Sequence, residues 1–97
     1  MNIHAALKQF EREFGKKHEE IADIFVKVSG RLNKMKDYLE NRPVVEWNYL
    51  EDLALQKPED SPEFQVLLHT KGWEEIILRR EFLHAIPIIS EEEINDK

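Results

Sequence analysis

Apolar residues recur about every three and a half positions between residues 3 and 41, and this repeat constrains the fold more than any other feature of the chain. A repeat of that period is typical of a helix that buries one stripe against a partner helix. With Leu7 taken as heptad position a, most a and d positions are apolar or aromatic. The stripe, called the seam below, consists of Ile3, Leu7, Phe10, Phe14, Ile21, Ile24, Val28 and Met35.

Two glycines, Gly15 and Gly30, lie within the repeat and weigh against an unbroken helix. Each costs about 1 kcal/mol relative to alanine inside a helix, and either can end one. The repeat nevertheless keeps its phase across both glycines, which favours one helix over about residues 3–41, with a kink near Gly30 as the milder variant. Pro43 ends it, because the residue before a proline avoids the α region. The competing interpretation is a helical hairpin, broken at one of the glycines, that packs on its own sheet.

A continuous helix of this length needs a partner. It spans roughly 58 Å, and the residues after it are too few to cover an apolar stripe that long. The seam therefore predicts a homodimer. Antiparallel pairing is favoured, because it sets Glu13 and Glu20 opposite Lys34 and Lys27 of the second copy.

The second half of the chain predicts a small antiparallel sheet of three to four strands. Residues 43–50 are rich in β-branched and aromatic side chains and favour a strand, and a helix over 44–55 is the competing interpretation. Residues 63–70 and 73–80 flank Gly72 and indicate a β-hairpin, and residues 82–89 add a further strand. The side chains expected on the inner face of the hairpin are Phe64, Val66 and Leu68.

These elements predict one α+β domain. It consists of a coiled-coil-like helix over residues 1–42, a β-rich region over 43–89 and an acidic tail over 90–97. Charge is divided in the same way. Residues 1–42 carry nine Lys/Arg and seven Asp/Glu, whereas residues 43–97 carry five and thirteen, giving the net charge of −6.

Nucleic-acid binding is an alternative that the basic residues of the helix keep open. The excess of acids repels phosphate backbones, and the basic side chains are not interleaved with aromatic residues for base stacking. Pairing with acids on the same helix is their more usual role. The residues that would contact phosphates are Lys16, Lys17, Lys27, Arg31 and Lys34.

No motif for catalysis, a metal or a cofactor is recognisable. The stretch "HEEIA" at His18 lacks the second histidine of a zinc helix. His69 and His84 are the only other candidates for acid–base chemistry, and ordinary half-buried histidines are favoured. The chain has no cysteine, which fits a reducing compartment. It also shows no signal peptide and no apolar run of membrane-spanning length, so a cytoplasmic location is expected.

The function predicted from these features is a non-enzymatic interaction or regulatory protein, of the adaptor or inhibitor type, that homodimerises through its N-terminal helix. The alternative is a nucleic-acid accessory factor that uses the basic residues above. A small enzyme with His69 or His84 is the weakest alternative.

Overall fold

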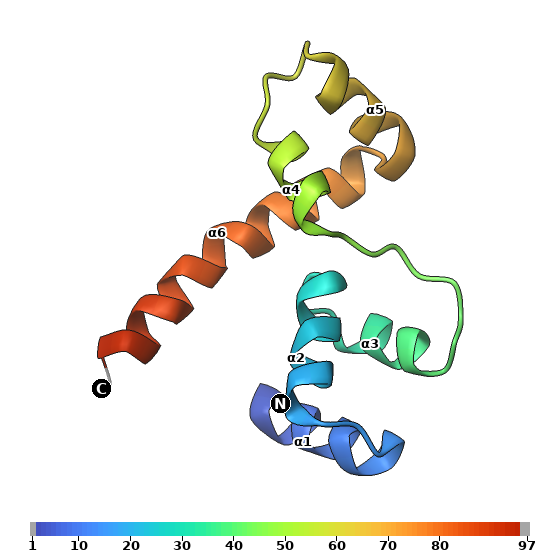
Figure 1. Cartoon of the computed structure of the whole chain (residues 1–97), viewed down its shortest axis with the longest axis vertical. Coiled ribbons are helices and arrows are strands. Elements are labelled where there is room, and N and C mark those ends of the chain that lie inside the picture. The colour runs from blue at the N-terminus through green and yellow to red at the C-terminus, as the bar shows by residue number, and fades with distance from the viewer. Residues whose placement is uncertain (1, 96–97) are drawn as a thin grey trace. The chain divides into compact units, whose positions relative to one another are not determined.

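The computed structural model describes residues 2–95, with side chains described through residue 85. Over these residues the chain forms six helices and no strand (Figure 1). The predicted α+β fold with an antiparallel sheet is therefore wrong. The chain divides into two compact units, called unit 1 (Met1–Trp47) and unit 2 (Asn48–Lys97) below.

Unit 1 contains three short helices in place of the single helix predicted over residues 3–41. They are α1 (Ile3–Phe14), α2 (His18–Lys27) and α3 (Leu32–Leu39). Gly15 ends α1 with a φ of 62°, and its N–H donates to the carbonyl of Glu11. Ser29 and Gly30, with φ of 58° and 70°, follow α2. Left-handed backbone of this kind cannot continue a right-handed helix, so both glycines break the helix that the sequence pattern had favoured.

The core of unit 1 is built from the same seam. Ile21, Ile24, Val28 and Met35 are buried together between α2 and α3. The partly buried residues around them include Leu7 and Phe10 of α1, Leu32 and Leu39 of α3, and Val44 beyond it. Three helices of one chain thus share the stripe that was predicted to face a second copy.

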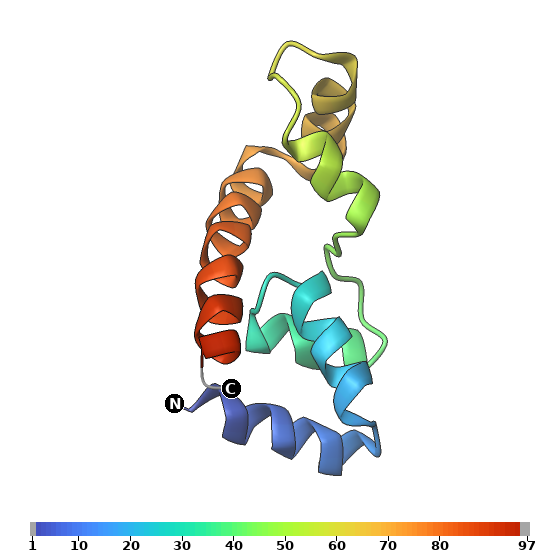
Figure 2. The same ribbon diagram turned by 60° about the vertical axis from the view of Figure 1, so that its left-hand side comes forward.

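Unit 2 also consists of three helices. They are α4 (Tyr49–Leu55), α5 (Pro62–Lys71) and the long α6 (Trp73–Asn95). Helix α4 packs on α5 and α5 on α6, and α6 runs well past both in the two views (Figure 2). The start of α4 is fixed by a capping box, in which Asn48 accepts from the N–H of Glu51 and donates its own N–H to the Glu51 carboxylate. Ser61 caps α5 in a similar way, ahead of Pro62.

The predicted strands of the second half are all parts of these helices or the segments between them. Residues 44–55, for which a strand and a helix were both considered, form a segment without helix or strand that is followed by α4. The residues expected to form the hairpin instead form α5 and the start of α6, and residues 82–89 continue α6. Burial follows a helical spacing: Phe64 and Leu67 are buried, as are Ile76 and Arg79. Val66, expected inside a sheet, is 67% exposed.

Two smaller points complete the fold. Residues 90–95 of the predicted acidic tail belong to α6, and residues 96 and 97 lie outside the described part of the chain. Among the described residues, no helix is both long enough and apolar enough to cross a membrane.

Candidate functional site

The residues predicted to form a dimer interface are largely used inside unit 1. Ile21, Ile24, Val28 and Met35 are buried in its core. Leu7 and Phe10 pack against that core, and Phe14 is half-buried. Ile3 alone of the set is more than half exposed. The uninterrupted seam on which antiparallel pairing was built is not present, although homodimerisation itself stays a prediction.

The basic residues considered for phosphate binding are spread over unit 1 and lie among acids. Lys16 is 3.8 Å from the Glu20 carboxylate. Lys27 lies over the ring of Tyr38 at 5.6 Å from its centroid. Arg31 donates to the carbonyl of Val28, and the remaining two are exposed Lys17 and half-buried Lys34. A hollow of about 290 Å³ that Lys16 and Lys27 line is also lined by Glu20 and Asp23, so its charge is mixed.

The histidines considered for catalysis lie on separate helices. His69 is exposed on α5 and His84 is exposed on α6. Among the described residues, no group of three His, Cys, Asp or Glu side chains is placed to hold a metal ion. His18, at the start of α2, is exposed and lies 3.2 Å from the carboxylate of Glu11.

Helix α4 of unit 2 is the unusual element, because its charged side chains face its own unit. Asp52 accepts two hydrogen bonds from Arg79 of α6, from Nε and Nη2, each 2.8 Å long. Arg79 is only 1% exposed, and the ring of Phe82 lies 5.2 Å from its guanidinium carbon. A guanidinium needs such a two-point partner to be buried at tolerable cost.

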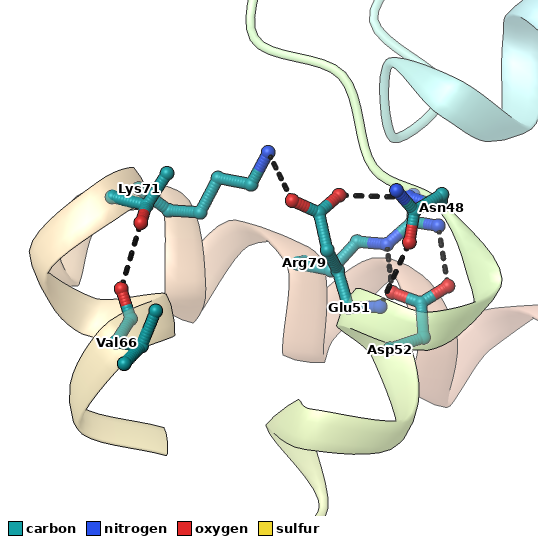
Figure 3. Close-up of polar contacts among 7 residues, drawn as sticks. Asn48, Glu51, Asp52, Val66, Lys71 and Arg79 are labelled. Atoms are coloured by element: carbon teal, nitrogen blue, oxygen red, sulfur yellow. Dashed lines mark hydrogen bonds and ion pairs between the residues drawn. The ribbon is translucent and has the colours of Figure 1, made fainter. Parts of the chain in front are cut away.

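Glu51 makes the second inward contact of α4. Its carboxylate lies 3.0 Å from the ammonium of Lys71, whose side chain is 10% exposed. The other oxygen of the same carboxylate accepts from the N–H of Asn48, as Figure 3 shows. Both acids of α4 are therefore engaged by basic side chains of α5 and α6.

The apolar side chains of α4 consequently point outward. Tyr49 and Leu50 are each 74% exposed and Leu53 is 40% exposed, on a helix of seven residues. Leu55, at the end of α4, is the large apolar residue that the helix does bury. Surface helices normally arrange these groups the other way round, with apolar residues inside and acids in water.

A shallow groove between α4 and α5 extends this apolar face. Its volume is about 220 Å³, and most of its exposed lining is apolar. Val66 of α5 lines it, and the Thr70 hydroxyl donates to the Val66 carbonyl at 2.7 Å. The residues that line the groove are Asn48, Leu50, Glu51, Ala54, Glu63, Val66, Leu67 and Thr70. We call these residues the α4–α5 groove, and Tyr49, Leu50 and Leu53 the outer face of α4.

The sequence interpretation missed this site, although two local patterns mark its helices. "NYLE" at 48–51 has the spacing of a capping box, and "SPE" at 61–63 is a typical helix start. Both precede stretches whose composition favours strands or fits either a strand or a helix. The pairing of Asp52 with Arg79 joins residues far apart in the chain, and no pattern in the sequence indicates it.

Comparison of the chain with protein-family models, with curated proteins and with solved structures finds no match.

Proposed function

We propose that this chain is a non-enzymatic interaction protein, of the adaptor or inhibitor type, which binds a partner protein through the outer face of α4 and the α4–α5 groove. The observation that carries the proposal is the inverted orientation of α4. The helix gives its acids to Lys71 and Arg79, and leaves Tyr49, Leu50 and Leu53 in water.

Exposed apolar residues are common singly, but a cluster of them on one short helix beside an apolar groove is characteristic of a binding surface. Covering a large apolar side chain contributes about 1.5–3 kcal/mol. The outer face therefore offers several kcal/mol to any partner that covers it. The groove beside it supplies the concave shape that fixes where such a partner sits.

Site-specific photo-cross-linking in the native cell tests the proposal. A photoreactive amino acid is placed at Leu50 or Val66, and in separate chains at Ile77 or Ile3 as controls. The control positions are exposed as well, about half of each side chain, but they lie outside the outer face and the groove. We expect positions 50 and 66 to yield adducts with the same protein, identified by mass spectrometry, and the control positions to yield none with it. Equal adducts at all four positions, or none at 50 and 66, contradict the proposal.

The predicted homodimer is examined by the same experiment. An adduct between two copies of the chain at position 50 would assign the outer face to self-association. That interface would differ from the predicted seam, whose central residues are inside unit 1.

A further inference from the structure

We infer that the segment bound in the α4–α5 groove is a basic amphipathic helix: its apolar stripe covers the groove, and its Lys and Arg side chains face the surrounding acids. This inference rests on the proposed function and specifies the partner.

The charge of unit 2 is the first reason. Residues 48–97 carry five Lys/Arg and twelve Asp/Glu, a net charge of −7. Three of these bases are already in ion pairs within the unit, namely Lys71 with Glu51, Arg79 with Asp52 and Arg80 with Glu59. The field of the unit is therefore negative, and three of its five cations are held by its own acids. A cationic partner is attracted and oriented by such a surface.

The acids are placed where they can act on a bound segment. Glu63 lines the groove at the first turn of α5, and exposed Asp60 lies in the loop just before it. None of the described residues that line the groove is Lys or Arg. Basic side chains flanking an apolar stripe would thus find Glu63 in the lining, where the adjacent cation, Lys71, is already paired with Glu51.

The secondary structure of the partner follows from hydrogen bonding. The groove lies between helices whose backbone groups are already bonded within each helix, so it offers no strand edge to pair with. A segment that buries its backbone against apolar walls must satisfy its own N–H and C=O groups. A helix does so, and it presents apolar side chains at i, i+3, i+4 and i+7 along one stripe.

Three synthetic peptides of about 15 residues, near the length at which isolated helices become stable, test the inference. The first has leucine at the stripe positions and lysine elsewhere, the second replaces lysine with glutamate, and the third keeps lysine but replaces leucine with serine. Binding to the full chain is followed by fluorescence anisotropy of labelled peptide. We expect the leucine–lysine peptide to bind at least about tenfold more tightly than either of the others. Its affinity should fall between about 50 and 500 mM salt.

Variants of the chain locate the binding. Leu50→Gln and Val66→Thr should each weaken the leucine–lysine peptide several-fold, whereas Ile77→Gln on α6 should not. Glu63→Lys should also weaken it, while Glu81→Lys, an exposed acid of α6 outside the groove, should have a smaller effect. Circular dichroism of each variant checks that the helices are retained.

The outcomes separate the inference from the proposed function. Suppose that the lysine and glutamate peptides bind alike and that Leu50→Gln and Val66→Thr weaken both equally. This result would support the proposed binding surface but contradict a basic partner. If Ile77→Gln weakens binding as much as Leu50→Gln, the groove is not the site and the proposed function fails as well. A dimer in sedimentation that Leu50→Gln dissociates would assign the groove to a second copy, which also overturns the basic helix.

Discussion

Unit 1 and unit 2 are similar in length and helix number but use the faces of their helices differently. In unit 1, α2 and α3 turn Ile21, Ile24, Val28 and Met35 toward one another and most of their charged residues toward water. In unit 2, α4 turns Glu51 and Asp52 toward basic side chains of its own unit and leaves its larger apolar side chains exposed. The first arrangement is what burial alone would produce.

The difference indicates that the stability of unit 2 does not explain the orientation of α4. A buried ion pair is on average no more stabilising than well-packed apolar residues of the same size, because both charges lose their hydration. Unit 2 therefore gains little by burying Arg79 against Asp52 in place of an apolar pair. The ion pair instead holds α4 in an orientation that exposes its outer face, which is the surface that the proposed function uses.

Loss of the Asp52 carboxylate should be the most damaging single change. Asp52→Ala leaves the guanidinium of Arg79 buried without this partner, and we expect the free energy of unfolding of unit 2 to fall by about 4 kcal/mol. The whole free energy of unfolding of a unit of this size is only about 5 kcal/mol, at about 0.1 kcal/mol per residue. The indole N–H signal of Trp73, whose ring lies against Phe64, reports on unit 2, and the ring signals of Tyr38, which packs against the core of unit 1, report on unit 1. A urea titration followed by NMR should therefore show unit 2 unfolding first.

A double variant is the control for this prediction. Asp52→Leu combined with Arg79→Met removes both charges, and should recover stability to within about 1 kcal/mol of the parent protein. If the double variant is as unstable as Asp52→Ala, the ion pair is not the reason for the loss.

Truncation of Ile21 should have the next largest effect, and in the other unit. Its side chain is fully buried, and Ile21→Ala should lower the free energy of unfolding of unit 1 by about 3 kcal/mol. Ile3→Ala, on the exposed side of α1, serves as the matched control and should change it by less than about 0.5 kcal/mol. If Ile21→Ala moves the Trp73 transition to lower urea as far as the Tyr38 transition, the two cores are not separate.

Gly15→Ala distinguishes broken from continuous helices by the sign of its effect. The backbone at Gly15 is left-handed, and a Cβ there would meet nothing within 4 Å, so the cost is purely conformational. We expect Gly15→Ala to lower the free energy of unfolding of unit 1 by about 1 kcal/mol. In one continuous helix the same change would stabilise by about 1 kcal/mol. Thermal unfolding followed by circular dichroism measures the sign, and a rise in the melting temperature would contradict the break at Gly15.

These effects also show what could be predicted from the sequence. In unit 1 the periodicity indicated helix and an apolar stripe, whose central residues Ile21, Ile24, Val28 and Met35 were predicted to face a second copy and are buried inside one chain. It did not identify the breaks, because the connections after α1 and α2 are each close to one helical turn in length and so preserve the phase of the repeat. Preserved phase favours one helix, but three short helices that share one core produce the same pattern.

In unit 2 the local composition was misleading for a different reason. Phe64, Val66 and Leu68 alternate as in a strand, but Phe64 and Leu67 are the pair that is buried. The capping residues Asn48 and Ser61 carried the correct information, and the β-branched and aromatic residues were given more weight. The orientation of α4 depends on a contact with Arg79 of α6, and local patterns do not contain contacts of that range.

The smallest expected effect is the one that bears most directly on the comparison of the two units. Leu50→Gln keeps helix propensity almost unchanged, and because Leu50 is 74% exposed it should alter the free energy of unfolding by less than about 0.5 kcal/mol. Leu55→Gln, on the same helix but 5% exposed, should cost about 2 kcal/mol or more, since it buries an amide in apolar surroundings. Urea unfolding of the two variants side by side therefore measures which face of α4 the protein needs for its own stability. Equal losses would mean that the chain itself covers Leu50, in which case the outer face is part of a core and no partner is required to explain it. A loss confined to Leu55→Gln, together with the weaker peptide binding expected of Leu50→Gln, would separate the residues that hold unit 2 together from those that bind.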